Sequence, residues 1–209
     1  MSLQPCITRL VSYDARTLKI VLEYAGLSLT KFVDSQLMSQ LSEDTQHQIL
    51  LNVSSGLDHI HANNVIHGDL TPQNILYNGT VAKICDFGLS RKDGNLIDHN
   101  GGSPCYIPRE YLYEGRRGAP ADIWAFGVIM LFVSGLMPIP QGSWLIADIF
   151  SDPGVQSEMV DWLCKVDKVA DKIPERLSLV RRMLASNPRR RITAAALVEN
   201  LSLHVGLIA

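Results

Sequence analysis

The sequence predicts an α+β fold in which short strands come first and helices follow. Two runs of aliphatic and β-branched residues, Ile7–Ser12 and Leu18–Tyr24, are typical of strands. From Ser42 onward, apolar residues recur at helical spacing. The 209 residues are 46% hydrophobic, which is enough to bury the core of one domain, or of one domain with a small appendage.

The two N-terminal runs are separated by a short polar stretch, which predicts an antiparallel pair of strands. The next element is a helix that we expect to begin near Ser42. Its hydroxyl can cap the helix, while Glu43 and Asp44 lie in the first turn, where negative charge is favourable. One apolar stripe follows at helical spacing: Leu50, Val53, Leu57 and Ile60.

A hairpin is expected beyond this helix, because Asn78-Gly79 lies between two apolar runs and Asn-Gly favours a two-residue turn. Such a turn would pair Tyr77 with Thr80. Continuing the ladder outwards places Asn74 opposite Lys83.

In this register, Asp86 lies three residues, roughly 10 Å at most, beyond the partner of Asn74. The amide oxygen of Asn74 and the carboxylate of Asp86 are therefore expected at one end of a small sheet. Asp69 lies in the loop that enters this sheet, within the stretch HGDLTPQN at residues 67–74. A cluster of Gly, Asp, Pro and Asn is also typical of a solvated turn.

The three oxygen-bearing side chains suit a different role, that of a catalytic loop. Mg²⁺ takes one or two protein oxygens and completes its coordination with water and phosphate oxygens. Phosphoryl transfer also needs a carboxylate that orients the attacking hydroxyl. The loop and the hairpin that follows it meet both needs.

Composition argues against nucleic acid and membrane as partners. The formal net charge is −2, whereas binding by bulk charge normally needs a basic face. Arg189–Arg191 is the only compact basic run, and we expect it to be solvated or ion-paired. The apolar run at residues 123–140 is interrupted by Ser, Gly and Pro and is shorter than the ~20 residues of a membrane span. It predicts a buried helix.

The four cysteines predict a reducing compartment. Cys6, Cys85, Cys105 and Cys164 are far apart and form no Cys-x-x-Cys pair, so neither a disulfide framework nor a zinc site is indicated. No secretory signal peptide opens the chain. We expect an intracellular protein, in the cytoplasm or alternatively the nucleus.

The catalytic-loop interpretation agrees with a known family. His67–Asn74 resembles the catalytic loop of the eukaryotic protein kinases, and Asp86-Phe87-Gly88 resembles their metal-binding DFG motif. Residues 102–110 are similar to the end of the activation segment, with Pro108-Arg109-Glu110 where the family usually has Ala-Pro-Glu. Pro72 and the Gly-Ser-Pro segment are more similar to the Ser/Thr-type kinases than to the tyrosine kinases.

Further resemblances extend over nearly the whole chain. Asp122–Gly127 resembles the start of the buried central helix, and Asn187-Pro188 followed by Arg191 resembles the late motif whose Arg pairs with the activation-segment Glu, here Glu110. Residues 4–10 resemble the approach to the fourth strand of the small lobe. The implied fold is protein-kinase-like: a mainly helical large lobe at 26–209, with a remnant of the small-lobe sheet at 1–25.

The resemblance implies roles for individual residues. Asp69 would accept the proton of the substrate hydroxyl, and Asn74 and Asp86 would hold Mg²⁺. The ATP cofactor would contact the hinge at Glu23 and Ala25. Completing this set, Leu76 would lie under the adenine.

The chain also departs from the family pattern. Nothing before Pro5 matches the Gly-rich loop, the strand lysine or the helix whose Glu pairs with that lysine, so most of the small lobe is missing from these residues. Thr71 stands where Ser/Thr kinases carry a lysine, and Gly68 replaces the Arg of His-Arg-Asp. That Arg pairs with a phosphorylated activation segment in the family. We therefore expect weak or no turnover by this chain alone.

Two alternatives stay open at this point. One is a catalytically inactive pseudokinase that acts as a binding or scaffold module. The other is a small-molecule kinase of the aminoglycoside or choline type, whose catalytic loop has a similar sequence. Apolar members of the small-lobe face, among them Ile7, Leu22 and Phe87, would be partly uncovered, which predicts a docking partner over that face in addition to a protein substrate.

Overall fold

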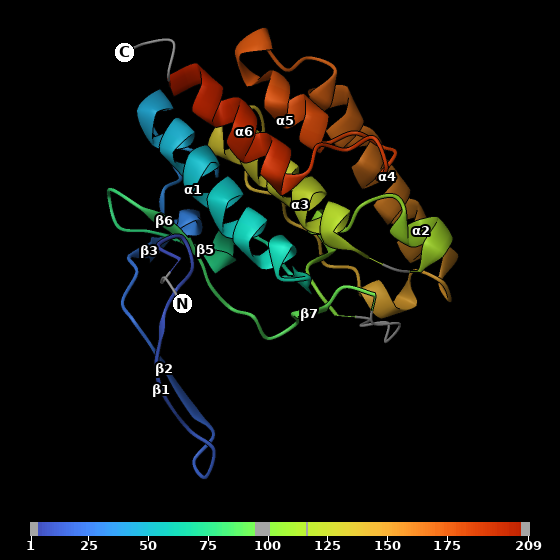
Figure 1. Ribbon diagram of the computed structural model, residues 1–209. Helices are drawn as coiled ribbons and strands as arrows, with labels where there is room; N and C mark the ends of the chain where they lie inside the picture. The colour runs from blue at the N-terminus through green and yellow to red at the C-terminus, as the bar shows by residue number, and fades with distance from the viewer. Residues whose placement is uncertain (1–3, 95–100, 116, 206–209) are drawn as a thin grey trace.

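The computed structural model describes residues 4–94, 101–115 and 117–205. Figure 1 shows a body of packed helices, with the hairpin of β1 and β2 extending away from it. The helices are α1 (Glu43–Ala62), α2 (Tyr111–Glu114), α3 (Ala119–Val133), α4 (Pro153–Ala170), α5 (Ser178–Met183) and α6 (Ala194–Val205). The strands are β1 (Leu10–Asp14), β2 (Lys19–Leu22), β3 (Leu27–Ser28), β4 (Val65–Ile66), β5 (Ile75–Tyr77), β6 (Ala82–Ile84) and β7 (Arg91–Lys92). Five short 3₁₀ helices connect them: η1 (Leu29–Lys31), η2 (Pro72–Asn74), η3 (Pro104–Tyr106), η4 (Ile146–Asp148) and η5 (Glu175–Leu177).

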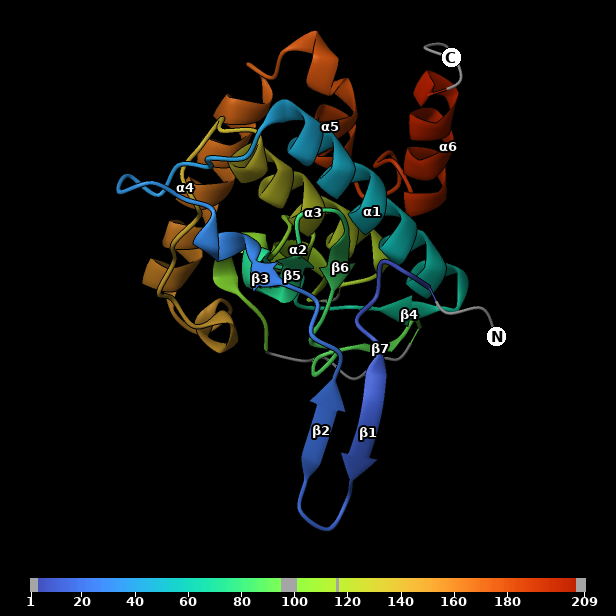
Figure 2. The same ribbon diagram turned by 90° about the vertical axis from the view of Figure 1, so that its left-hand side faces the viewer.

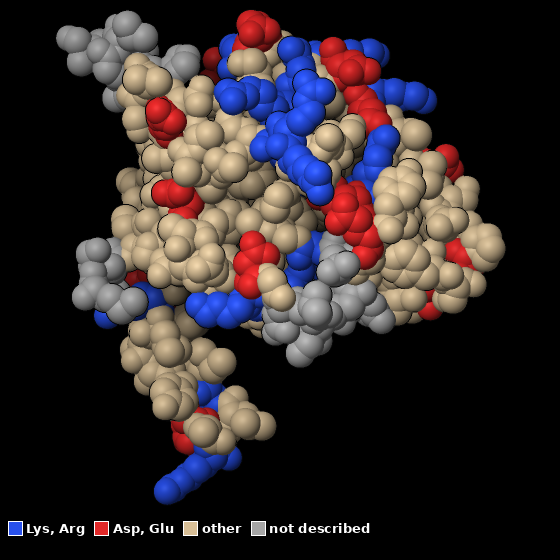
Figure 3. Space-filling view, turned by 45° about the vertical axis from the view of Figure 1, so that its right-hand side comes forward, with Lys and Arg blue, Asp and Glu red and all other residues tan. Residues whose placement is uncertain are grey.

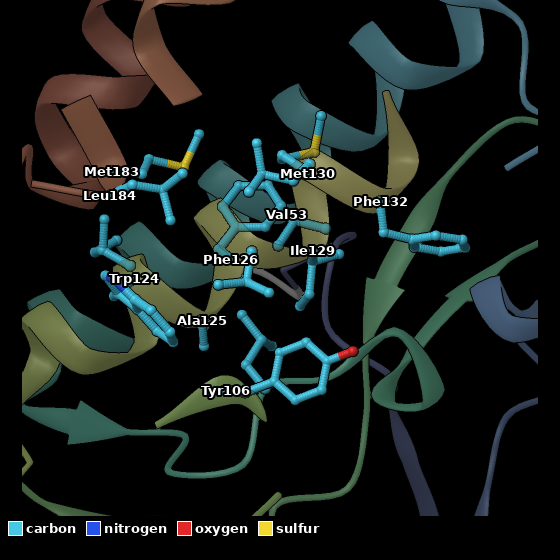
Figure 4. Close-up of a cluster of buried hydrophobic side chains, with 14 of the residues drawn as sticks. Val53, Tyr106, Trp124, Ala125, Phe126, Ile129, Met130, Phe132, Met183 and Leu184 are labelled. Atoms are coloured by element: carbon cyan, nitrogen blue, oxygen red, sulfur yellow. The ribbon is translucent and has the colours of Figure 1, made fainter. Parts of the chain in front are cut away.

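Helix α3 forms the centre of the core. All of its residues from Ala121 to Val133 are buried, and α1 and α5 pack against it. Figure 4 shows Phe126 and Ile129 of α3 grouped with Val53 of α1 and with Met183. The prediction of a buried helix in the apolar run is confirmed. Among the described residues, no helix is both long enough and apolar enough to span a bilayer.

Helix α1 begins where the sequence predicts. The Ser42 hydroxyl accepts a hydrogen bond from the Thr45 amide at 3.3 Å, which satisfies one of the free N–H groups of the first turn. The predicted apolar stripe is buried against α3, α6 and β6. This packing fixes the end of α1, from which the chain enters β4 and the loop at residues 67–74.

The hairpin register was predicted incorrectly. Tyr77 pairs with Ala82, not with Thr80, so the connection has four residues. The cause is the Asn78 side chain, whose Oδ1 accepts hydrogen bonds from the amides of Thr80 (3.0 Å) and Val81 (2.9 Å) and holds the longer turn. The shifted register places Asn74 beside Cys85, whose amide donates to the Asn74 carbonyl at 2.9 Å. Asp86 is therefore closer to Asn74 than predicted.

The N-terminal strands form the expected antiparallel pair, but their bounds differ from the prediction. Ile7 lies outside the hairpin and forms a parallel bridge to Ile84 of β6. The Thr8 amide donates to the Ile84 carbonyl at 2.9 Å, which directs this part of the chain along β6 before β1 begins. No sequence pattern predicts these backbone hydrogen bonds.

The β1–β2 hairpin exposes apolar side chains on both faces. Every residue of both strands is exposed, and Tyr13 and Ile20 reach 73% and 71% exposure. Figure 2 shows the hairpin extending from the body with no other element against it. Leu22 is exposed, and Ile7 and Phe87 are half-buried, so all three are at least partly uncovered, as expected.

The basic run near the C-terminus divides between core and surface. Arg189 and Arg190 are exposed, whereas Arg191 is buried. Figure 3 shows Lys and Arg side chains gathered near the top of one face, with Asp and Glu side chains beside them. The face in this view therefore has mixed charge.

Candidate active site

The loop at residues 67–74 is anchored by a buried histidine. His67 has 0% exposure, and its Nε2 donates to the Cys85 carbonyl at 3.0 Å. Its Nδ1 accepts the Asp69 amide at 3.3 Å, and its ring packs edge-on against Phe87 with centroids 5.0 Å apart. Both ring nitrogens are engaged, so His67 has a structural role.

A buried carboxylate supports the same loop from α3. The Asp122 side chain accepts the backbone N–H groups of His67 (2.8 Å) and Gly68 (3.0 Å), and His61 of α1 donates to it at 2.9 Å. Burial alone would raise the pKa of Asp122. The His61 ring and the backbone donor of Gly68 outweigh that effect and hold the pKa below its ordinary value.

Asp122→Asn is expected to destabilise the fold by about 1–3 kcal/mol, because an amide nitrogen would face one of the two buried N–H donors. The matched control is Asp161→Asn on the exposed face of α4, which should change stability by less than about 0.5 kcal/mol. Urea denaturation of both variants measures the difference. Equal stabilities would contradict the supporting role of Asp122.

The lowered pKa of Asp122 also fixes the sign of a pH effect. Its contribution to stability is present above the ordinary carboxyl pKa and is lost as the pH falls through the lower pKa of the folded state. Asp122→Asn should therefore flatten the acid limb of the stability profile.

Asp69 presents an oxygen without a partner. Its Oδ1 is buried, and no hydrogen-bond partner for it occurs among the described residues. Its backbone carbonyl accepts the Asn74 side-chain Nδ2 at 2.9 Å. A buried, unpaired carboxylate oxygen is costly for folding, and such sites occur where a ligand or substrate supplies the missing partner.

Asn74 and Asp86 lie at the same end of the β5–β6 hairpin, as predicted, although the register differs from the predicted one. Asn74 is buried, and its Nδ2 bond to Asp69 leaves the amide oxygen as the end that can face a cation. Asp86 directly follows Cys85, the backbone partner of Asn74, and is exposed. Its φ of 60° is in the left-handed region, and its Oδ1 accepts the Gly88 amide at 3.2 Å. Loop and hairpin thus place Asp69, Asn74 and Asp86 in one neighbourhood.

Glu23, Ala25 and Leu76 are the residues that the sequence predicts to contact the adenine. The Glu23 side chain forms an ion pair with Lys83 of β6 at 2.6 Å and also accepts the Arg9 amide at 2.9 Å. The bond from Lys83, followed by that from Arg9, lowers the pKa of Glu23. Both bonds are made to Oε1, so this oxygen is engaged within the protein. Ala25 is buried, and Leu76 of β5 is half-buried opposite Lys83.

The predicted pair between Glu110 and Arg191 is confirmed. The guanidinium binds both carboxylate oxygens, at 2.6 and 2.9 Å, and also donates to the carbonyls of Pro120 (2.7 Å) and Ala185 (3.0 Å). This buried group connects the end of the activation segment to α3 and to the turn before α6. Arg109, next to Glu110, forms an ion pair with Asp167 of α4.

Two residues near the loop, His61 and Arg117, were not predicted from the sequence as part of the site. His61 follows Leu57 by one helical turn, so the apolar stripe of α1 could have indicated that it faces the core. Arg117 is buried and donates to the Gly68 carbonyl at 3.2 Å. No residue pattern indicates that contact, because the two residues are far apart in the sequence.

Comparison with known proteins finds similarity to protein kinases. The family model of the protein kinase domain matches residues 4–201. CBL-interacting protein kinase 10 of Oryza sativa subsp. japonica is 33% identical over 220 residues, which cover 97% of this chain and 45% of that protein. CBL-interacting serine/threonine-protein kinase 8 of Arabidopsis thaliana is 32% identical, over 91% of this chain and 42% of that protein.

A fungal relative extends the comparison. The carbon catabolite-derepressing protein kinase of Candida albicans is 29% identical over 87% of this chain and 28% of that protein. The chain spans less than half the length of these three curated relatives. The match nonetheless includes the catalytic-loop region, the DFG region and the Glu110–Arg191 pair within one family model. The chain therefore belongs to the protein kinase domain family.

Proposed function

We propose that residues 26–209 are the large lobe of a Ser/Thr protein kinase and that this lobe transfers the γ-phosphate of ATP to a protein hydroxyl. The observation that carries the proposal is the buried, unpaired Oδ1 of Asp69, which lies in a loop fixed by His67 and Asp122. In protein kinases the Asp of this loop accepts the proton of the substrate hydroxyl. One relative is named as a serine/threonine-protein kinase, which supports a Ser or Thr hydroxyl as the acceptor.

The cofactors in this proposal are ATP and Mg²⁺. Asn74 and Asp86 would hold the metal, because their oxygens are of the type that Mg²⁺ prefers, the Asn74 amide oxygen is left free by the Nδ2 bond to Asp69, and Asp86 is exposed. Bound Mg²⁺ neutralises the charge of the phosphates. The backbone of Glu23 and Ala25 and the side chain of Leu76 would contact the adenine.

A pocket beside Asp69 supports a protein acceptor. Its volume is about 330 Å³, and it shares Ser103 and Tyr106 with a smaller pocket that contains Asp69. No charged residue lines it; its walls are Thr30, Thr71, Pro72, Gln73, Ser103, Pro104, Cys105, Tyr106, Ile139, Pro140, Gln141 and Gly142. We expect acceptor peptides whose residues near the Ser or Thr are uncharged.

The exposed hairpin supports a further protein contact. Residues 1–25 would be the remnant of the small lobe, and the apolar faces of β1 and β2 are uncovered. We propose that strands from outside this sequence, in a partner or in the rest of a longer protein, cover them. The plant relatives are named as CBL-interacting, which supports protein partners in general.

The second candidate function is a pseudokinase that serves as a binding module. Thr71 in place of the catalytic-loop lysine favours it, because the loss of one electrostatic donor typically costs about 10²–10³ in rate. The same exposed hairpin would then be its binding surface.

Transfer of labelled phosphate from Mg-ATP tests the proposed function. The acceptors are a Ser peptide with uncharged neighbours, its Tyr counterpart, a Ser peptide with Arg neighbours, and an amino alcohol. We expect the uncharged Ser peptide to be labelled best. Labelling of the amino alcohol alone would indicate a small-molecule kinase, and no labelling would favour the pseudokinase.

A further inference from the structure

Arg117 connects two functional segments through one guanidinium group. The side chain is buried, with 7% exposure. Its Nη1 donates to the Gly68 carbonyl at 3.2 Å, and its Nη2 donates to the Gly101 carbonyl at 2.6 Å. The guanidinium also lies over the Tyr111 ring, 5.4 Å from its centroid. The contacts run from the catalytic loop to the activation segment and on to α2.

Two glycines keep the surroundings of this arginine open, one beside Arg117 itself and one beside Leu89 and Arg91. Gly68 has a φ of +83°, and a Cβ added there would lie 2.7 Å from the Leu89 carbonyl oxygen. Gly102 has a φ of +121°, and an added Cβ would lie 2.8 Å from Nη1 of Arg117. A side chain at either position would force the neighbouring backbone or the arginine to move. Gly102 therefore leaves the space that the Arg117 guanidinium occupies, and Gly68 leaves space for the Leu89 carbonyl and the Arg91 guanidinium.

A second arginine holds the backbone of the first. The Arg91 guanidinium of β7 donates to the Arg117 carbonyl. Its Nη1 lies 3.3 Å from the ideal Cβ position of Gly68. Arg91 and Arg117 thus lie close to residue 68. The kinases that this chain resembles carry an arginine at the position of Gly68.

The middle of the segment between Asp86 and Glu110 has no hydroxyl side chain, although Ser90, Ser103 and Tyr106 flank it. Between Ser90 and Ser103, residues 91–102 contain no Ser, Thr or Tyr. We propose that Arg117 is a positioning residue that fixes the catalytic loop to the activation segment without phosphorylation of that segment. The inference rests on the proposed function for its catalytic meaning, whereas the contacts themselves can be tested without activity.

Hydrogen exchange of the full chain tests the proposal. Arg117→Met removes both donors but keeps an unbranched side chain that can pack on Tyr111, and Arg117→Lys keeps one donor group. Arg182→Met is the matched control, because Arg182 is exposed and its Nη1 donates to the Asn200 side chain at 3.3 Å. The variants are treated with phosphatase before exchange, and the wild type is measured both with and without this treatment.

We expect Arg117→Met to accelerate exchange about tenfold in segments 67–74 and 101–107 and to leave α6 unchanged, because only the local links are lost. Arg117→Lys should fall between this variant and the wild type. Phosphatase treatment of the wild type should have no effect. Where transfer is measurable, Arg117→Met should lower kcat and leave KM for the peptide unchanged.

Three results would overturn the proposal. The first is an exchange rate in Arg117→Met that equals that of Arg182→Met in both segments. The second is exchange in α6 that accelerates as much as exchange in the two segments. The third is a phosphatase-treated wild type that shows the same exchange pattern as Arg117→Met. A wild-type chain that transfers no phosphate would instead count against the proposed function. The exchange comparison would still decide the role of Arg117.

Discussion

Arg191→Leu is expected to lower the free energy of unfolding by about 3–5 kcal/mol. The Arg191 side chain has 0% exposure and donates to both oxygens of Glu110 and to two backbone carbonyls. The substitution leaves the Glu110 carboxylate buried without its cation. Such an uncompensated charge costs more than the pair contributes, which is why removal of one partner has a large effect.

The neighbouring residue provides the control. Arg190→Leu changes an exposed side chain and should alter stability by less than about 0.5 kcal/mol. In the double variant Glu110→Leu/Arg191→Leu, part of the lost stability should return, because neither charge is left buried alone. Urea denaturation of the four proteins measures these differences. Equal effects of Arg191→Leu and Arg190→Leu would show that the buried pair is not required.

Asp69→Asn is expected to lower kcat for peptide phosphorylation by about 10²–10⁴. The amide cannot accept the proton of the substrate hydroxyl, although its size matches the carboxylate. Stability should change by less than about 0.5 kcal/mol, because Oδ1 of Asp69 has no hydrogen bond to lose within the described residues. Initial rates with the uncharged Ser peptide measure the effect.

The control for this prediction is Asp161→Asn, an equivalent substitution on the exposed face of α4. Its rate should equal that of the wild type. A decrease of less than tenfold in Asp69→Asn, at unchanged stability, would remove Asp69 from the proposed mechanism. A large loss of stability in the same variant would assign it a structural role instead.

Local patterns predicted much of the fold. The cap at Ser42, the apolar stripe of α1 and the buried helix α3 follow from periodicity and from capping chemistry, which depend on neighbouring residues. The bidentate pair of Glu110 and Arg191 was predicted through the family resemblance.

Other features depend on contacts that no local pattern encodes. The Asn78 side chain lengthened the predicted two-residue turn and moved the register by two residues. The backbone bond between Thr8 and Ile84 shifted the first strand. Arg117 reaches Gly68 across 49 positions of sequence, so its place at the catalytic loop was not predictable from spacing.

The proposed function requires that this lobe hold Mg-ATP through Asn74 and Asp86. The most direct test is the Tm of the purified chain with and without Mg-ATP, repeated on Asp86→Asn. A ligand that binds only the folded state adds about 2.7 kcal/mol at 100 times its Kd, which raises Tm by several degrees. We predict a rise in the wild type that requires Mg²⁺ and is lost in Asp86→Asn. No rise in the wild type, or an equal rise in both proteins, would contradict the claim.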